Sequence, residues 1–243
     1  MSKVVVVTGA SKGIGAATAI AFGKAGYDVV VNYRSDVAIA EQVVQKINEL
    51  GQQAVAVRAD VFTEQGIQKL FHEVRTKFSK IDVFVNNAGN APEPDFGKYT
   101  HDEVSKALSD NFGTVALCTQ EALKVMDKGS ILFTSSVYGL NFNGNPNKPL
   151  YSASKAAMIN FVESMAERLT PDIRCNSVAP GHTLTEGRKS QDKEYADKML
   201  NMTLQKEWVA PEEIAAAFVF LAETPHITGQ TIVVDAGWQK KIR

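Results

Sequence analysis

Short apolar segments alternate along the chain with longer segments in which apolar residues recur every three or four positions. The short segments are rich in valine and isoleucine and are apolar almost throughout. This pattern is expected for strands that are buried on both faces of a parallel sheet. The predicted strands lie at 4–8, 28–33, 54–57, 82–86, 130–135, 173–179 and 231–235.

The longer segments have helical periodicity, seen most clearly at 13–26, 37–51 and 63–78. Two of them end in glycine, which is common at the end of a helix. The alternation predicts an α/β fold of the Rossmann type, a doubly wound, seven-stranded parallel sheet with helices on both faces. No linker rich in Pro, Gly or Ser divides residues 1–243, so we expect a single domain. The polar segment 182–208 has the length expected of a mobile substrate lid.

The charge and composition of the chain argue against several functional classes. A net charge of −1 gives no overall field that would attract nucleic acid or an anionic membrane. The apolar runs at 4–7 and 214–222 are too short for a secretory signal or a membrane span. Two cysteines without CxxC spacing fit a reducing compartment, and the four scattered histidines form no metal-binding cluster. We therefore expect a cytoplasmic protein with no metal, nucleic-acid or membrane partner.

The segment "TGASKGIG" (8–15) follows the first predicted strand and leads into the first helix. Its glycines allow a tight turn and close backbone approach, and the helix start offers unpaired N–H groups to a pyrophosphate. Glycines also close ordinary turns, but this strand–turn–helix context predicts dinucleotide binding. A Walker loop is excluded because no Gly-Lys-Ser/Thr follows at the required spacing. The predicted contacts are Gly9, Ser11, Lys12, Gly13, Ile14 and Gly15.

The segment after the second strand bears on the choice of cofactor. Where an acidic side chain usually binds the ribose, the chain has Tyr33 followed by Arg34. Arg34 and Lys12 suit a 2′-phosphate, and one charge-assisted hydrogen bond would favour NADP(H) by about tenfold or more. In the alternative, Arg34 is a solvated loop charge and Asp36 binds a ribose. The predicted contacts here are Asn32, Tyr33, Arg34 and Ser35.

Seven motifs in order resemble the short-chain dehydrogenase/reductase family over essentially the whole chain. They are "TGASKGIG" (8–15), "ADV" (59–61), "NNAG" (86–89), "DNFG" (110–113), "SSVYG" (135–139), "YSASK" (151–155) and "APG" (179–181). The resemblance implies an NAD(P)-binding domain over 1–243, and it places further cofactor contacts at the adenine, the ribose and the nicotinamide. These are Asp60, Val61, Asn87, Ala88, Gly89, Pro180, Gly181 and Thr183, with Thr185 nearby.

The same resemblance implies that Asn111, Ser136, Tyr151 and Lys155 are catalytic, and that the last two also contact the cofactor. Tyr151 and Lys155 are four apart on a predicted helix and share a face. A cation within about 6 Å stabilises a phenolate and draws the phenol pKa towards the working range. Ser136 would hold the carbonyl oxygen, and Asn111 would fix a water that connects Lys155 to solvent. Each residue also has a structural reading as a turn, cap or helix-backbone partner.

Two features of this part of the sequence depart from the family's common reductases. The loop 139–149 is slightly longer than usual. The catalytic serine is consequently a choice between Ser135 and Ser136, and the "VYG" that follows favours Ser136. The loop should line the substrate mouth, and its length bears on substrate choice rather than on chemistry.

The resemblance is nearest to the 3-oxoacyl-[acyl carrier protein] reductases of that family. It implies an NADPH-dependent reductase that transfers a hydride to the ketone of a 3-oxoacyl thioester. The mixed charges of "KVMDKGS" and "RLTPDIR" weaken the expectation of an acidic carrier partner. The loop 139–149 and "HTLTEGRK" favour the alternative of a free small carbonyl or alcohol, such as a sugar, pterin or quinone. A non-catalytic NADP(H) sensor is a further alternative, and the resemblance also implies a homotetramer or homodimer.

Overall fold

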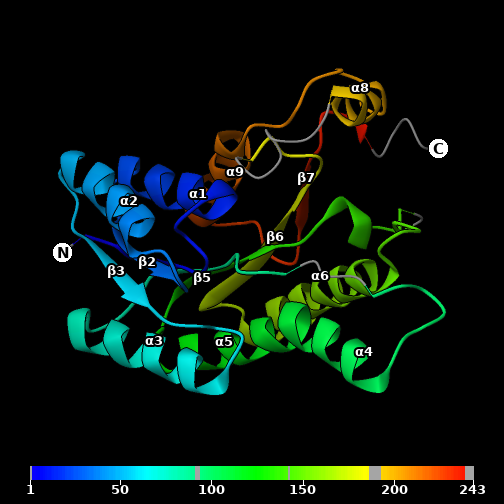
Figure 1. Ribbon diagram of the computed structural model, residues 1–243. Helices are drawn as coiled ribbons and strands as arrows, with labels where there is room; N and C mark the ends of the chain where they lie inside the picture. The colour runs from blue at the N-terminus through cyan, green and yellow to red at the C-terminus, as the bar shows by residue number, and fades with distance from the viewer. Residues whose placement is uncertain (1, 91–93, 142, 186–192, 239–243) are drawn as a thin grey trace.

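The computed structural model describes residues 2–90, 94–141, 143–185 and 193–238. One parallel sheet has the strand order β3-β2-β1-β4-β5-β6-β7 (Figure 1). All seven predicted strands are present, which confirms the predicted fold class. The order reverses between β1 and β4, and such a switch point is where open α/β sheets bind ligands. The strands are β1 (Val4–Val7), β2 (Asp28–Tyr33), β3 (Ala54–Arg58), β4 (Val83–Asn86), β5 (Gly129–Thr134), β6 (Ile173–Pro180) and β7 (Thr231–Val234).

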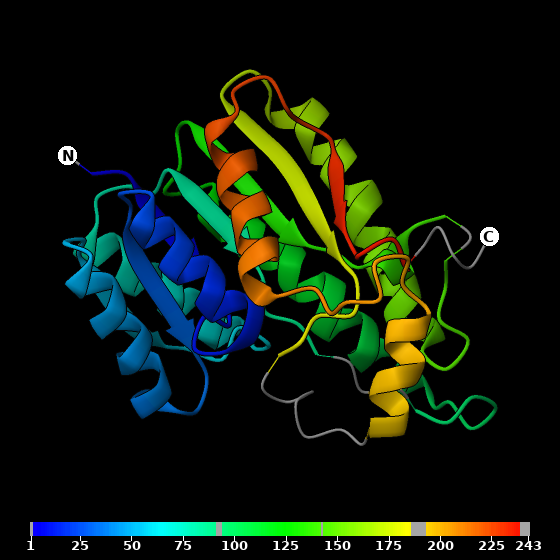
Figure 2. The ribbon, with the colours of Figure 1, turned by 90° about the horizontal axis from the view of Figure 1, so that it is seen from above.

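Helices cover both faces of the sheet. One layer contains α1 (Gly13–Lys24), α2 (Val37–Glu49) and α9 (Pro211–Glu223). The other contains α3 (Glu64–Lys77), α4 (His101–Leu108), α5 (Thr114–Ala122) and α6 (Pro149–Leu169). A π-helix, η1 (Ser109–Gly113), joins α4 to α5, and a 3-10 turn, η2 (Val137–Gly139), follows β5. The helix α8 (Lys193–Asn201) lies apart from both layers (Figure 2).

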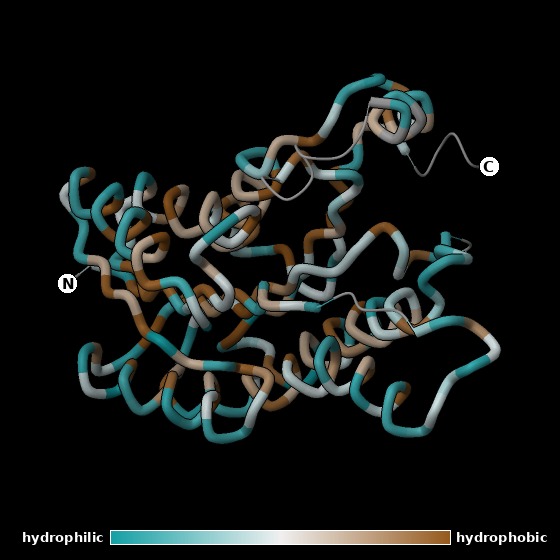
Figure 3. The backbone as a smooth tube through the Cα atoms, viewed as in Figure 1, coloured by the Kyte–Doolittle hydropathy of each residue, from teal (hydrophilic) through white to brown (hydrophobic). Residues whose placement is uncertain are grey.

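The strand β1 explains why the predicted strands lack polar alternation. Val4 and Val6 pack into the apolar cluster beneath α3, α5 and α6, whereas Val5 and Val7 pack into the cluster beneath α1, α2 and α9. Figure 3 shows the hydrophobic residues gathered between these layers. Burial of each such side chain contributes about 1.5–3 kcal/mol. The two helical layers therefore fix the position of the strand from which the glycine turn starts.

Local signals set the ends of the first helices. Asp36 caps α2 by accepting a 3.2 Å hydrogen bond from the backbone N–H of Ile39. Gly26 and Gly51 follow α1 and α2 with φ of 88° and 86°, the left-handed conformation expected after a helix end. The helices α1, α2 and α3 each follow the end of a strand, so the connecting segments predicted to bind the cofactor lie at the carboxyl edge of the sheet. Among the described residues, no helix is both long and apolar enough to span a membrane.

Candidate active site

The turn after β1 has the backbone geometry that its glycines predicted. Gly9 and Gly13 have positive φ of 62° and 57°. A Cβ atom at Gly15 would lie 2.2 Å from the carbonyl oxygen of Gly9, so only glycine fits there. The helix α1 starts after Lys12, and no described side chain caps it. Its first N–H groups therefore face the turn, where an anion can accept hydrogen bonds from them.

Two asparagines hold this turn in place. The side chain of Asn32 accepts a 3.1 Å hydrogen bond from the N–H of Gly9 and donates one of 3.0 Å to the carbonyl of Ala59. The amide of Asn87 donates a 2.9 Å bond to the carbonyl of Thr8. Both side chains therefore shape the turn by bonding backbone groups. A direct contact of either side chain with the cofactor stays a prediction.

The ends of β2 and β3 carry cations. The Arg34 guanidinium lies 5.7 Å above the ring of Phe62, and Nε of Arg58 donates a 3.3 Å hydrogen bond to the carbonyl of Arg34. Within the described ranges, none of Lys12, Arg34 and Arg58 belongs to an ion pair. Arg58 was not among the residues predicted from the sequence to contact the cofactor. The signal was its place at the end of a predicted strand, where it pairs in register with Tyr33.

Three other residues at the end of β2 or just after it were considered as cofactor ligands, and the structure gives them different surroundings. The ring of Tyr33 is buried in the cluster beneath α1 and α2, so a cofactor contact through that ring stays a prediction. Ser35 is exposed. The carboxylate of Asp36, the alternative ribose ligand, caps α2. An N-cap carboxylate already has a structural role, which weakens the alternative.

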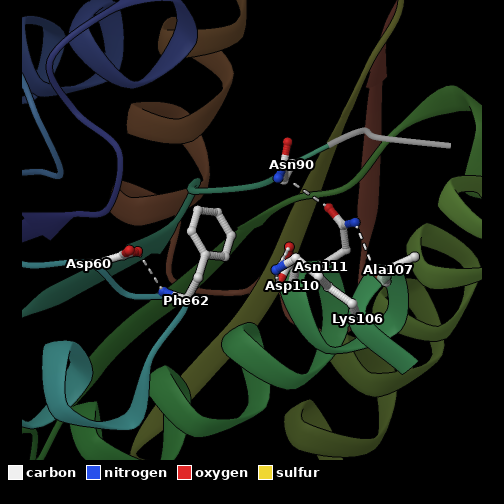
Figure 4. Close-up of polar contacts among 7 residues, drawn as sticks. All are labelled: Asp60, Phe62, Asn90, Lys106, Ala107, Asp110 and Asn111. Carbon is white, nitrogen blue, oxygen red and sulfur yellow. Dashed lines mark hydrogen bonds and ion pairs between the residues drawn. The ribbon is translucent and has the colours of Figure 1, made fainter. Parts of the chain in front are cut away.

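The predicted adenine side is a turn built on the start of α3. The carboxylate of Asp60 accepts a 3.2 Å hydrogen bond from the N–H of Phe62 (Figure 4). A Cβ atom at Gly66 would lie 1.9 Å from the carbonyl oxygen of Asp60, which shows how closely α3 approaches. Val61 is buried beside it. Asp60 and Val61 follow the carboxyl end of β3, and their contact with an adenine stays a prediction.

Asn111 lies in the π-helix η1 and is buried. Its side chain accepts a 3.1 Å hydrogen bond from the N–H of Asn90 and donates one of 3.0 Å to the carbonyl of Ala107 (Figure 4). A Cβ atom at Gly89 would lie 3.5 Å from Oδ1 of Asn111 and 3.8 Å from Nζ of Lys155. Gly89 therefore lies close to both Asn111 and Lys155, two predicted catalytic residues. Because it has no side chain, it leaves the space beside them open. The predicted water at this place stays a prediction, although π-turns often occur at functional sites.

Tyr151 and Lys155 both lie on α6, as their spacing predicted. Nζ of Lys155 is 5.6 Å from the centre of the Tyr151 ring and donates a 2.7 Å hydrogen bond to the carbonyl of Thr134. Lys155 is only 3% exposed, and this burial lowers its pKa to about 8. A Cβ atom at Gly139 would lie 2.6 Å from the Lys155 backbone, so η2 packs directly against the helix that carries the pair.

The two candidate serines have different partners. The hydroxyl of Ser135 donates a 2.9 Å hydrogen bond to the carbonyl of Val178 inside the sheet, and the residue is 2% exposed. The hydroxyl oxygen of Ser136 accepts a 3.2 Å bond from the N–H of Tyr138. A hydroxyl that accepts one bond still has its proton to donate. This geometry favours Ser136 as the residue that holds a substrate oxygen.

A cavity of about 570 Å³ is lined by some of the predicted residues, although neither Asn111 nor Lys155 is among the residues that line it. Ser136 and Tyr151 line it beside Ile14 from the glycine turn. The segment after β6 lines it too, through Pro180, Gly181, Thr183 and Thr185. Gly181 is required there because a Cβ atom would lie 2.6 Å from Cα of Asp235.

Five polar residues on the cavity wall were not predicted as site residues: Thr134, Tyr138, Asn145, Lys148 and His182. The signals were present, since Asn145 and Lys148 belong to the loop 139–149 and His182 begins the predicted lid. Nε2 of His182 lies 3.2 Å from the hydroxyl of Tyr138. These side chains give the substrate end of the cavity a polar surface.

The predicted lid is described only in part. Thr183 forms a parallel bridge with Val209, and the N–H of Leu184 donates a 2.9 Å hydrogen bond to the carbonyl of Val209. The first part of the segment is therefore joined to Val209, the residue that directly follows the segment. Residues 186–192 lie outside the described residues, and motion of a lid stays a prediction.

Comparisons with known proteins identify the family of the chain. A family model described as Enoyl-(Acyl carrier protein) reductase matches residues 9–239. The chain is 37% identical to a 3-oxoacyl-[acyl-carrier-protein] reductase of Synechocystis sp., over 97% of this chain and 96% of that protein. It is 36% identical to glucose 1-dehydrogenase 2 of Bacillus subtilis, over 97% of this chain and 94% of that protein. These relatives agree in reaction type but differ in substrate.

Solved structures are similar over nearly the whole chain. A short chain dehydrogenase from Burkholderia cenocepacia J2315 in complex with NADP has a TM-score of 0.90 at 29% identity, covering 98% of both chains. A 7 alpha-hydroxysteroid dehydrogenase complexed with NADH and 7-oxo glycochenodeoxycholic acid has a TM-score of 0.89 at 34% identity. That match covers 97% of this chain and 93% of the other. The two complexes contain different nicotinamide cofactors.

Proposed function

The chain belongs to the short-chain dehydrogenase/reductase family of oxidoreductases, which act on CH–OH and C=O groups, and we propose that it is an NADP(H)-dependent carbonyl reductase. One observation carries the proposal. Tyr151 and Ser136 line a single cavity, and the buried amine of Lys155 lies 5.6 Å from the Tyr151 ring. Such a set suits the transfer of a proton to a carbonyl oxygen.

The residues around the glycine turn fit a dinucleotide. Gly9, Gly13 and Gly15 would accommodate the pyrophosphate, since a Cβ at Gly15 would meet backbone. Arg34 and Arg58 would hold a 2′-phosphate through guanidinium hydrogen bonds, which match phosphate geometry well. This is the support for NADP(H) over NAD(H). When bound, the cofactor supplies the hydride for reduction or accepts it for oxidation.

Residues of the chain would perform the remaining steps, each with a separate role. The Ser136 hydroxyl would donate to the substrate carbonyl oxygen and hold it for the charge that develops there. Tyr151 would give its proton to the same oxygen. The ammonium of Lys155 would stabilise the phenolate that remains, and the carbonyl of Thr134 fixes that amine through the 2.7 Å hydrogen bond. Asn111, with a water, would return a proton from solvent.

Two substrate classes have support. The first is the 3-oxoacyl thioester of acyl carrier protein, supported by the relative with that activity. The second is a free polar carbonyl or alcohol such as a sugar, supported by the polar wall of the cavity and by the glucose dehydrogenase relative. We propose the first as the principal substrate and keep the second as the alternative.

The test measures NADPH and NADH consumption with acetoacetyl thioester, free and on acyl carrier protein, and with a panel of ketones and sugars. Turnover that rises when the carrier is attached supports the first class, and turnover only on free carbonyls supports the second.

Tyr151→Phe should bind NADPH as the native protein does and lose about 10²–10⁴-fold in kcat. Tyr27→Phe, at a tyrosine that does not line the active-site cavity, is the matched control. Substantial turnover by Tyr151→Phe with unchanged cofactor affinity would contradict the proposal. NADPH binding without any turnover would point to the sensor.

We also propose a cytoplasmic location and assembly as a homotetramer or homodimer. Both cysteines, Cys118 and Cys175, are buried free thiols, which supports a reducing compartment. Analytical ultracentrifugation of the purified protein tests the assembly, since a monomer at micromolar concentration would contradict it.

A further inference from the structure

A tyrosine–histidine pair lies on the substrate side of the cavity. The hydroxyl of Tyr138 and Nε2 of His182 are 3.2 Å apart, although 44 positions separate them in the chain. Both residues line the cavity that Ser136 and Tyr151 line. The proposed mechanism uses neither of them. A partly buried polar pair beside a reaction site is a candidate for substrate recognition.

Aromatic packing holds the pair in one orientation. His182 is 6% exposed, and its ring meets those of Trp208 and Trp238 at centroid distances of 6.2 Å and 5.5 Å. The ring of Tyr138 contacts Trp238 edge-on at 5.1 Å, with 88° between the ring planes. Since the two rings are packed in this way, the pair is preorganised and a ligand need not order it.

The backbone connects Tyr138 to a proposed reacting group and anchors the segment that carries His182 on the sheet. The N–H of Tyr138 donates a 3.2 Å hydrogen bond to the hydroxyl oxygen of Ser136, the residue proposed to hold the carbonyl oxygen. His182 directly follows Gly181, whose N–H donates a 2.9 Å bond to the carbonyl of Val234 in the sheet. The pair is therefore positioned to meet the part of a substrate next to its reacting carbonyl.

We propose that Tyr138 and His182 bind a second oxygen atom of the substrate, on a carbon one or two positions from the reacting carbonyl. The proposal rests on the proposed reductase function. A tyrosine hydroxyl has one donor and also accepts, and a neutral imidazole has one nitrogen of each kind. If His182 donates to Tyr138, the phenol proton is directed to the substrate. If Tyr138 donates to His182, its oxygen accepts from a substrate hydroxyl.

The chemistry suits both substrate classes and excludes simple ketones. A 3-oxoacyl thioester has its second oxygen on the thioester carbonyl, and a sugar or hydroxyketone has it on the neighbouring hydroxyl. A plain ketone offers no such atom and would leave the pair facing an apolar chain. Sites built to hydrogen-bond a substrate group discriminate strongly against analogues that lack it.

Matched small substrates provide the test. Ethyl acetoacetate is compared with 2-hexanone, and 3-hydroxy-2-butanone with 2-butanone, by NADPH consumption. We expect kcat/KM of the native protein to favour the oxygenated member of at least one pair by about tenfold or more. A preference in the first pair identifies a 1,3-related carbonyl, and a preference in the second identifies a neighbouring hydroxyl.

Variants then assign the preference to the pair. Tyr138→Phe retains the ring that packs on Trp238 and should reduce the preference about tenfold, the effect of one lost hydrogen bond. His182→Leu should reduce it similarly. His72→Leu, at an exposed histidine on α3, is the control in which the ratio stays at the native value. The readout is a ratio between two substrates, so a variant with less folded protein lowers both values and leaves the ratio unchanged.

The outcomes separate the inference from the function on which it rests. Equal kcat/KM for the members of both pairs, or a preference that neither Tyr138→Phe nor His182→Leu changes, would overturn the inference alone. Native protein that binds NADPH but reduces none of these ketones, the thioesters or the sugars would overturn the proposed function, and the inference with it.

Discussion

The amine of Lys155 donates a 2.7 Å hydrogen bond to the backbone carbonyl of Thr134, the last residue of β5. The hydroxyl of Thr134 in turn donates a 3.2 Å bond to the side chain of Asn87, which follows β4. This chain of contacts fixes the amine that is proposed to stabilise the Tyr151 phenolate to the ends of two strands. Groups on such rigid elements keep their geometry better than groups on loops.

The first prediction concerns the buried charge of Lys155. Burial lowers its pKa from 10.5 to about 8, so the unfolded chain holds this proton more tightly than the native protein does. Native stability should therefore rise as the pH increases from about 8 to about 10.5. Relative to Lys155→Met, the native free energy of unfolding should gain up to about 3 kcal/mol across that window.

Chemical denaturation of both proteins without cofactor, at a series of pH values, measures this difference. Comparison with Lys155→Met cancels the titration of other buried groups, such as the Cys118 and Cys175 thiols, whose pKa values burial raises to about 12. A difference that does not change with pH would show that the amine does not lose its charge more easily in the native protein.

The second prediction separates the two serines. Ser136→Ala should lower kcat by about 10²–10³-fold, because a donor to the developing oxyanion is lost. Ser135→Ala removes bonds to the carbonyl of Val178 and to the hydroxyl of Ser177 inside the sheet, and should cost about 0.5–1.5 kcal/mol of stability with little change in kcat. Steady-state kinetics and thermal unfolding of both variants distinguish these effects. The reverse pattern would move the catalytic role to Ser135.

The third prediction uses two glycines with different surroundings. In Gly15→Ala the new Cβ would lie 2.2 Å from the carbonyl oxygen of Gly9, so the turn must shift. Overpacking of this kind lowers the free energy of unfolding by about 1–3 kcal/mol. We expect weaker NADPH binding as well, because the turn is displaced. Gly144→Ala, which has nothing within 4 Å of the new methyl, is the matched control. Fluorescence titration with NADPH and melting curves test both, and equal affinities in the two variants would contradict the assigned phosphate turn.

The fourth prediction concerns cofactor choice. Arg34→Ala and Arg58→Ala should each lower the preference for NADPH over NADH by about tenfold, since each removes a charge-assisted hydrogen bond. Asp36→Ala should cost about 1 kcal/mol of stability through the lost cap of α2 and leave the preference unchanged. Binding constants for both cofactors test this. Weaker NADH binding by Asp36→Ala would instead support the ribose alternative.

The strands could be predicted from the sequence because a strand buried on both faces is apolar almost throughout. All seven apolar runs became strands, with ends that differ by one residue at most. The spacing of Tyr151 and Lys155 likewise predicted a shared helix face, because helix geometry is local.

Features that depend on contacts distant in sequence were not predictable in the same way. Tyr138 and His182 meet only because β5 and β6 are neighbours in the sheet, and nothing near either residue signals the contact. Arg58 reaches Arg34 through strand pairing. The orientation of the Asn32 side chain towards backbone groups also depends on the folded turn. The sequence motifs identified many of the residues at the site. Which atoms of these residues face the cavity or the backbone depends on tertiary packing.

The π-helix η1 has a consequence for insertions and deletions. Hydrogen bonds in a π-helix join residues five apart, so this turn holds one residue more than a turn of α-helix. Removing one residue would convert the turn to ordinary α-helix and leave α4 and α5 in phase, so the 3.1 Å hydrogen bond between Asn86 and Thr119 would be retained. The widened turn that carries Asn111 would be lost, and a single-codon deletion here would therefore disturb the bond between Asn111 and the N–H of Asn90 without moving α5 off the sheet.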